Sequence, residues 1–314
     1  MIGDLSFMIL IADSGSTKVH WCLLTASGQQ TDVRTEGINP VLQPYETICE
    51  TISNQLLPQI GKLLWAGTVT HVFFYGAGCT PEKKGLVKEA LESVFKKAEV
   101  TVESDMLGAA RGLLGDKEGV ACILGTGSGS CWYNGETIAW SVPSLGYILG
   151  DEGSGATLGK RLVGDLLKGQ LGVQNTEYGV QTELQEEGSQ ESNEDLKELF
   201  FEEMGTSMAD IIEHVYRQPF ANRYLAGLSR FCANHIKDAR IHALVHAHFV
   251  EFIRRNLVQY KVSTFSFVGS IAYYYRPILE EAMRDEGLQV GVVLQDPIEG
   301  LKAYHRSVLR PTTE

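Results

Sequence analysis

A turn rich in hydroxyl groups follows the first apolar segment of the chain. It contains Asp13, Ser14, Gly15, Ser16 and Thr17, directly after the apolar residues 8–12. Such a turn exposes successive backbone N–H groups to a phosphate, and its glycine lets the backbone come close. A carboxylate at the end of a strand can also hold Mg²⁺, usually through water, while the metal bridges the phosphates. The turn predicts a nucleotide-phosphate site with Asp13 as its metal residue, although a polar hairpin turn explains this segment alone equally well.

A second turn of the same kind follows the apolar residues 120–124. Its sequence is Gly125, Thr126, Gly127, Ser128, Gly129 and Ser130. The dinucleotide-binding pattern G-x-G-x-x-G would need glycine at Ser130, and a strand rather than a helix is expected to follow. The P-loop pattern is also missing, because Arg161 stands where a serine or threonine should follow Lys160. Two such turns could hold one triphosphate from both sides, and this pairing is more specific than either turn alone.

Two segments carry carboxylates that could act on a hydroxyl group. Asp105 stands where an expected strand meets an expected helix, a position at which catalytic residues of α/β folds gather. From there it could accept a proton from a substrate hydroxyl during phosphoryl transfer, and the alternative is an N-cap of the helix. Asp151 and Glu152 lie among glycines before another helix. Their carboxylates could bind sugar hydroxyls, or they could simply favour the start of that helix.

Two further motifs are weaker. Gly269 and Ser270 follow an apolar strand and could let an adenine ring lie flat against the backbone. His242, His246 and His248 form the pattern H-x-x-x-H-x-H, in which the first two share a helix face and could bind a metal. No glutamate follows His242 as in H-E-x-x-H, so a structural or solvated role is the favoured interpretation of these histidines.

The segments around these motifs alternate between strands and helices. We expect strands at 8–12, 19–24, 69–75, 100–103, 264–268 and 290–294, and helices at 45–64, 81–97, 106–114, 156–167, 209–216, 224–236, 239–257, 275–286 and 297–309. This alternation predicts an α/β fold. The opening pattern of strand, hydroxyl-rich turn and second strand returns from Gly119, and Asn134-Gly135 then marks a hairpin turn. The recurrence predicts two related domains, one of residues 1–114 completed by the helix 297–310, the other of residues 115–296 with an acidic excursion at 169–197.

The composition excludes several classes of protein. The chain has 27 Lys and Arg against 39 Asp and Glu, a net charge of −12. This argues against a protein that binds nucleic acid or a membrane surface, because both need a basic face. No run of residues approaches the roughly 18 apolar residues of a membrane span. The six cysteines are scattered without a C-x-x-C pair, so neither a zinc site nor a disulfide framework is expected, and we expect a cytoplasmic protein with reduced thiols.

Together these motifs resemble those of the superfamily of actin-like, sugar-kinase and heat-shock chaperone ATPases. The most specific segments are ADSGSTK at 12–18, ESDMLGAARG at 103–112, ILGTGSGS at 123–130, SLGYILGDEGSG at 144–155 and FVGS at 267–270. Within the superfamily the chain is similar to the N-acetylglucosamine kinase branch of the BadF/BadG/BcrA/BcrD ATPase family. The resemblance runs from Ile9 to about Gly300. It implies two ribonuclease H-like domains with ATP and Mg²⁺ in a cleft between them, and closure around a sugar.

The resemblance also implies a role for individual residues. Asp13 would organise Mg²⁺, Thr17 and Thr126 would contact the ATP phosphates, and Asp105 would be the general base on the 6-hydroxyl group of a sugar. The sugar would be lined by Asn39, Ser128, Gly146 and Asp151, and the adenosine would lie near Ala226, Gly269 and Ser270. The implied activity is ATP-dependent phosphorylation of N-acetyl-D-glucosamine or a close amino sugar at the 6-hydroxyl. A small-molecule sugar is then the partner, and a homodimer is left open.

The chain also departs from the family pattern. Vertebrate-type kinases carry Gly-Trp-Gly before the acidic turn, whereas this chain has Ser144-Leu145-Gly146. The expected aromatic partner of the acetamido group is therefore missing there, which leaves the identity of the sugar open. The activator ATPases of anaerobic acyl-CoA reductases and dehydratases hold an iron–sulfur cluster through cysteines, and none of the cysteines here lies in that helix-start context. An activator-type ATPase and a sugar-sensing pseudokinase remain alternatives.

Overall fold

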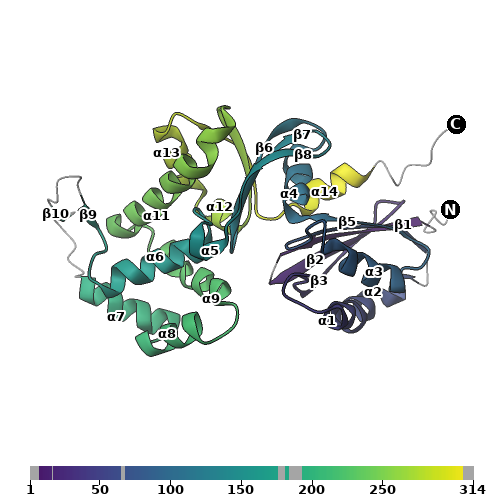
Figure 1. Cartoon of the computed structure of the whole chain (residues 1–314), viewed down its shortest axis with the longest axis horizontal. Coiled ribbons are helices and arrows are strands. Elements are labelled where there is room, and N and C mark those ends of the chain that lie inside the picture. Colours follow the sequence, from purple (N-terminus) through teal and green to yellow (C-terminus); the bar gives the residue numbers. More distant parts are fainter. Residues whose placement is uncertain (1–6, 16, 65–67, 176–180, 184–192, 307–314) are drawn as a thin grey trace. The chain divides into compact units, whose positions relative to one another are not determined.

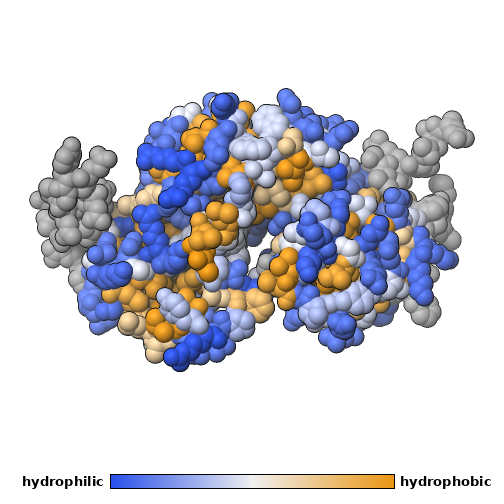
Figure 2. Space-filling view, viewed as in Figure 1, coloured by the Kyte–Doolittle hydropathy of each residue, from blue (hydrophilic) through white to orange (hydrophobic). Residues whose placement is uncertain are grey.

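The computed structural model describes residues 7–15, 17–64, 68–175, 181–183 and 193–306 of the chain. By its contacts the chain divides into two units (Figure 1). The first contains residues 1–121, 131–140 and 296–314, and the second contains residues 122–130 and 141–295. The cleft expected between the two units stays a prediction. The visible surface is mostly hydrophilic with separate apolar patches (Figure 2).

A sheet of five strands forms the centre of the first unit. Its strand order is β3-β2-β1-β4-β5. The strands are β1 (Phe7–Ser14), β2 (Lys18–Thr25), β3 (Gln30–Glu36), β4 (Thr68–Gly76) and β5 (Glu99–Ser104). The first three pair antiparallel as a meander, and β4 and β5 join β1 in parallel. This is the ribonuclease H-like order that the resemblance implies.

Helices cover both faces of this sheet, which explains why β1 and β2 are apolar almost throughout. One face carries α1 (Tyr45–Glu50), the π-helical segment η1 (Thr51–Leu56), α2 (Leu57–Leu64) and α3 (Lys84–Val94) (Figure 1). Met8, Leu10 and Ala12 of β1 belong to the core on that side. Strand side chains alternate between faces, so Ile9 and Ile11 point to the other side. There α4 (Asp105–Leu114) and α14 (Ile298–His305) pack against β1 and against each other.

A second sheet repeats this order. Its strand order is β12-β11-β6-β7-β8. From the opposite edge this is three consecutive strands followed by two later ones, which is the same order as β3-β2-β1-β4-β5 in the first sheet. The strands are β6 (Glu118–Leu124), β7 (Ser128–Asn134), β8 (Ile138–Val142), β11 (Thr264–Val268) and β12 (Gln289–Leu294), and β11 and β12 pair in parallel. The predicted recurrence of the opening hairpin is therefore confirmed as a recurrence of the sheet order.

The second unit holds most of the helices. They are α5 (Gly146–Leu149), α6 (Gly155–Leu167), α7 (Asn193–Met204), α8 (Met208–Tyr216), α9 (Ala221–Leu228), α10 (Arg230–Asn234), α11 (Ala239–Phe252) with the π-helical η2 (Ile253–Leu257) and the short η3 (Val258–Tyr260), α12 (Ser270–Tyr274) and α13 (Arg276–Asp285). Helix α6 packs against α9, and α11 packs against α13. In the described part of the chain, no helix combines the length and the apolar character needed to cross a membrane.

Most expected elements are present, and the differences have local causes. The expected helix 81–97 begins only at Lys84, because Pro81 lies in the turn before it. The expected helix 224–236 is two helices, since α9 ends before Ser229 and α10 begins after it. Strand β3 was not expected, because its sequence QTDVRTE is polar and only alternate residues are buried. Of the excursion 169–197, the short strands β9 (Val173–Asn175) and β10 (Gln181–Glu183) and the start of α7 are described, and 176–180 and 184–192 lie outside the described residues.

Candidate active site

The first hydroxyl-rich turn joins β1 to β2. Gly15 and Thr17 are exposed, and the Gly15 N–H donates to the carbonyl of Lys18 at 3.0 Å. The Ser14 hydroxyl is buried and is used within the fold, since it donates to the Ile38 carbonyl at 2.9 Å and accepts from the Ile38 N–H at 3.2 Å. Because the Ser14 hydroxyl is already engaged, the phosphate contacts predicted for this turn are left to its other residues. Ser16 lies outside the described residues.

Asp13 ends β1 on the face that α4 and α14 cover. Strand alternation puts it on the same side as Ile9 and Ile11, and Asp105 and Asp296 stand at the starts of the two covering helices. Burial raises the pKa of Asp13 to about 7, and the negative charges of Asp296 and Asp105 add to the effect. A carboxylate held in such surroundings is stabilised by a cation, because the cation supplies the missing opposite charge.

Asp296 is a residue of this cluster that the sequence analysis missed. It accepts a hydrogen bond from His20 Nδ1 at 3.3 Å, and the other ring nitrogen of His20 lies 3.0 Å from Asp32 Oδ1. The bond to Asp296 is the main cause that raises the pKa of His20, and His20 in turn lowers the pKa of Asp296 although burial opposes this. His20 thus lies between two carboxylates, which favour its charged form. The feature of the sequence that could have indicated Asp296 is the pair Asp296-Pro297 directly after the last strand.

The donor set of this cluster fits Mg²⁺. It consists of carboxylates from Asp13, Asp105 and Asp296, and hard cations such as Mg²⁺ prefer oxygen ligands. In the described part of the chain, these three carboxylates do not each bring one oxygen to within 4.8 Å of the other two. Contact through retained water molecules therefore suits them better than direct coordination by all three, and Mg²⁺ commonly keeps several waters.

Asp105 is not the cap of its helix. The N-cap of α4 is Ser104, whose side chain accepts from the Leu107 N–H at 3.2 Å, so the capping alternative for Asp105 is wrong. The Asp105 carboxylate instead accepts from the Met106 N–H at 2.9 Å. Burial raises the pKa of Asp105 and outweighs the backbone hydrogen bonds that lower it. A half-buried carboxylate with one oxygen engaged by the backbone is well placed to accept a proton with the other.

Asn39 is buried in the same unit and holds its own turn. Its side-chain Oδ1 accepts from the Val41 N–H at 3.0 Å, and the Gln43 side chain accepts from the Asn39 N–H at 2.8 Å. Gly78 lies against this side chain, because a Cβ added to Gly78 would stand 2.1 Å from Oδ1. The predicted contact of Asn39 with a sugar remains a prediction.

In the second unit the turn between β6 and β7 lies beside the acidic turn. The backbone N–H groups of Ser128 and Gly146 both donate to the Asp151 carboxylate and lower its pKa, but burial outweighs them and raises it. A Cβ added to Gly127 would lie 3.1 Å from Asp151 Oδ2. The structure therefore brings together Ser128, Gly146 and Asp151, the three residues of this unit that the resemblance assigns to the sugar.

Glu152 does not share this arrangement. Its carboxylate faces Asn256 at 3.4 Å and Arg255 at 3.7 Å, whereas its backbone carbonyl accepts from the Ser128 hydroxyl at 2.7 Å. Of the two acidic residues in the turn, only Asp151 thus remains a candidate for binding hydroxyl groups. Beside it, the apolar side chains Ile148 and Leu149 of α5 are 74% and 75% exposed.

The residues assigned to adenosine also lie near the second turn. Gly269 has a positive φ of 121°, and a Cβ there would lie 2.3 Å from the Leu124 carbonyl oxygen, so no other residue fits without movement. A Cβ added to Gly155 would lie 3.2 Å from Cβ of Ala226 and 3.4 Å from the Gly125 carbonyl oxygen. Small residues therefore bring Gly125, Ala226 and Gly269 close together. Such a surface of backbone and small side chains is suited to close approach by a flat ring or a phosphate.

A relative of known structure shows the family of this chain. No protein-family model and no curated protein matches the chain. The solved structure of a "putative N-acetylglucosamine kinase" from Porphyromonas gingivalis matches with 44% sequence identity and a TM-score of 0.85, over 96% of this chain and 99% of that chain. The chain belongs to the N-acetylglucosamine kinase-like family. A second "putative N-acetylglucosamine kinase", from Chromobacterium violaceum, shares the fold with a TM-score of 0.64 at 16% identity, over 98% of this chain and all of that chain.

Membership in the N-acetylglucosamine kinase-like family confirms the resemblance but leaves the departure at Leu145 unexplained. Leu145 is 58% exposed and lies directly before α5. The side chain that replaces the tryptophan of the vertebrate-type enzymes is therefore smaller and largely in solvent. The roles of Thr17, Thr126 and Ser270 toward ATP stay predictions.

Proposed function

We propose that the protein is an ATP-dependent sugar kinase that transfers the γ-phosphoryl group to the 6-hydroxyl of N-acetyl-D-glucosamine or a close amino sugar. The observation that carries this proposal is the state of Asp105. Its carboxylate lies directly after β5 and does not cap α4, because Ser104 does so. Burial raises the pKa of this carboxylate. A carboxylate of this kind is a stronger base than one on the surface, which suits removal of a proton from an alcohol.

The first unit would supply the base and hold the metal. Asp13 and Asp296 would hold Mg²⁺ through water, and the bound ion would neutralise charge on the ATP phosphates. The exposed Thr17 would donate to phosphate oxygens. Asp105 would accept the proton of the sugar hydroxyl while the hydroxyl oxygen bonds to the γ-phosphorus. The bond between the γ-phosphorus and the oxygen that bridges it to the β-phosphate would break, which releases ADP.

The second unit would position the two substrates. The Asp151 carboxylate, fixed by the N–H groups of Ser128 and Gly146, would accept hydrogen bonds from sugar hydroxyls. The backbone around Gly125 and Gly269 would lie against the nucleotide. Positioning and charge stabilisation supply most of the catalysis in phosphoryl transfer, so these fixed groups matter as much as the base.

The test is ADP release by the purified protein over a panel of hexoses and amino sugars, with Mg²⁺ and ATP. We expect N-acetylglucosamine or a close amino sugar to stimulate ADP release, with the product phosphorylated at the 6-hydroxyl as judged by NMR. A deoxy analogue that lacks the 6-hydroxyl is the matched control and should give no stimulation. ADP release that no sugar increases would contradict the proposal.

The described cysteines give the activator-type alternative no support. Cys22, Cys79, Cys122, Cys131 and Cys232 are buried, and Cys49 is half-buried. Burial raises the pKa of Cys22, Cys79, Cys131 and Cys232 to about 12. Ligands to an iron–sulfur cluster shared between subunits would need thiolates at the surface, so we do not propose that function.

A further inference from the structure

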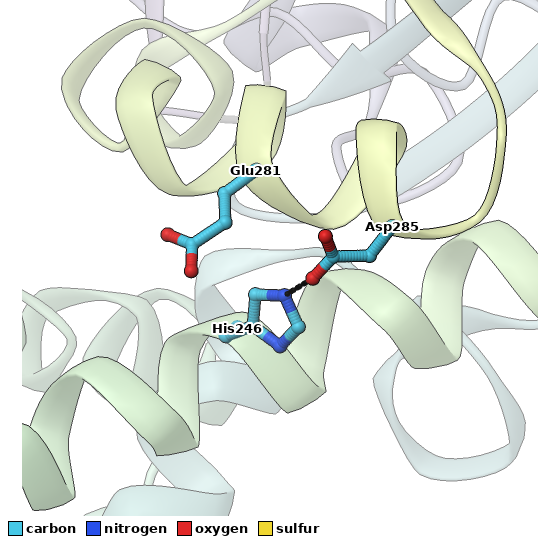
Figure 3. A group of neighbouring side chains, drawn as sticks. All are labelled: His246, Glu281 and Asp285. Carbon is cyan, nitrogen blue, oxygen red and sulfur yellow. Dashed lines mark hydrogen bonds and ion pairs between the residues drawn. The ribbon is translucent and has the colours of Figure 1, made fainter.

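One helix pair of the second unit carries a histidine and two carboxylates that converge in space. His246 of α11 faces Glu281 and Asp285 of α13 (Figure 3). One ligand atom from each residue lies within 4.8 Å of the other two, and His246 Nε2 lies 3.0 Å from Asp285 Oδ2. A second histidine, His242, lies one turn earlier on α11, and its Nε2 is 3.2 Å from Glu281 Oε2.

The scaffold holds these side chains in fixed positions. His242 and His246 are four residues apart on α11, and Glu281 and Asp285 are four residues apart on α13, so each pair shares one face of its helix. The two helices pack against each other. Both carry buried apolar residues, among them Val245 and Phe249 on α11 and Ile278, Leu279, Ala282 and Met283 on α13. The polar side chains stand at the edge of this contact, with 26% of His246 and 55% of Asp285 exposed.

We propose that His246, Glu281 and Asp285 form a binding site for a divalent transition-metal ion of the Zn²⁺ class. Nitrogen and carboxylate ligands at about 2.0–2.2 Å around a tetrahedral ion lie roughly 3.3–3.6 Å apart, and the three ligand atoms here already lie within 4.8 Å of one another. Two carboxylates and a neutral histidine carry a net charge of −2, which matches a divalent cation. Histidine favours Zn²⁺ over Mg²⁺, so this site differs in chemistry from the carboxylate cluster around Asp13.

His242 would act as a positioning residue at this site. Its ion pair with Glu281 would orient the carboxylate, which is the usual role of residues behind a metal ligand. Three protein ligands would leave a fourth position for water, as in open zinc sites. The bound ion would link α11 to α13 and stabilise the second unit by binding only the folded state.

The experiment uses the full chain freed of metal with a chelator and then titrated with Co²⁺, whose visible absorption bands report tetrahedral nitrogen and oxygen ligands. We expect one Co²⁺ per chain, displaced by Zn²⁺ added afterwards. His246→Gln should weaken Co²⁺ binding by more than about tenfold, because even changes behind the ligands cost ten- to a hundredfold. The matched control is His214→Gln, an exposed histidine on α8, which should bind as the wild type does.

Three results would overturn the proposal. The first is wild-type protein that shows no tetrahedral bands, which would leave two ion pairs between the helices and nothing more. The second is binding unchanged in both His246→Gln and Asp285→Asn, with circular dichroism showing both variants folded; Asp285→Asn also serves if the histidine variant does not fold. The third is loss of the bands in Asp13→Asn, which would place the ion in the first unit.

Discussion

Replacing Asp13 by asparagine should stabilise the first unit, and the gain should grow as the pH rises. Burial and two neighbouring carboxylates raise the pKa of Asp13 from 3.8 to about 7 in the folded chain. The folded state therefore binds this proton more tightly than the unfolded state does, and wild-type stability falls as the pH rises from about 4 to about 7. Asparagine resembles the protonated carboxyl in size and carries no charge, so the variant escapes this loss.

The magnitude follows from the shift in pKa. A shift of about 3 units corresponds to about 4 kcal/mol, since each unit is worth about 1.4 kcal/mol. At pH 5 Asp13 is still protonated in the folded wild type, and its raised pKa lowers the stability by only about 1–2 kcal/mol. At pH 8 nearly all of the loss of about 4 kcal/mol is present. The free energy of unfolding of Asp13→Asn should therefore exceed that of the wild type by about 2–3 kcal/mol more at pH 8 than at pH 5.

The assay is urea unfolding at pH 5, 6.5 and 8, in the presence of a chelator and without nucleotide. Asp116→Asn is the control, because Asp116 is exposed in the loop after α4. Adding Mg²⁺ at pH 8 should stabilise the wild type and narrow its gap to the Asp13 variant, since the ion is expected to bind the ionised carboxylate. A gap that stays constant from pH 5 to pH 8, or that matches the gap of the control, would refute the reasoning.

The remaining predictions concern activity and packing. Asp105→Asn should lower kcat by about a hundredfold or more while binding of an ATP analogue, measured by calorimetry, is unchanged; turnover near that of the wild type would show that Asp105 is not the base. Asp151→Asn should raise KM for the sugar by roughly tenfold and leave KM for ATP alone in steady-state kinetics, and equal effects on both would contradict its assignment. Gly269→Ala should lower the melting temperature and weaken nucleotide binding, because its Cβ would lie 2.3 Å from the Leu124 carbonyl oxygen. Gly227→Ala, with nothing within 4 Å of the added Cβ, should do neither.

The strands and their end residues could be predicted from the sequence because they depend on local patterns. The apolar run before Asp13 marks β1 and its end, and the same pattern before Gly125 marks β6. The repeat of this pattern was enough to predict two related sheets. Strand β3 was not predicted because its sequence lacks an apolar run. It lies at a sheet edge and buries only alternate residues.

The environment of a side chain could not be predicted, because distant segments create it. Asp296 is 276 residues from His20, whose hydrogen bond lowers the pKa of that carboxylate. Ser14 has the same hydroxyl group as its neighbours in the turn, but Ile38 engages it. The sequence also could not separate Asp105 from Ser104 as the cap of α4, since both residue types cap helices well.

The contrast between Asp13 and Asp296 gives the carboxylate cluster an order of ionisation. His20 lies next to Asp296 and holds its pKa low, so this carboxylate stays charged across the neutral range. Burial raises the pKa of Asp13 to about 7, and the charge of Asp296 adds to this effect. A divalent cation that binds Asp13 at neutral pH displaces a proton from it, and this displacement costs little because the pKa of Asp13 lies near the ambient pH. His20 thus favours the charged form of Asp296, and burial together with the charge of Asp296 favours a protonated Asp13 until a cation binds.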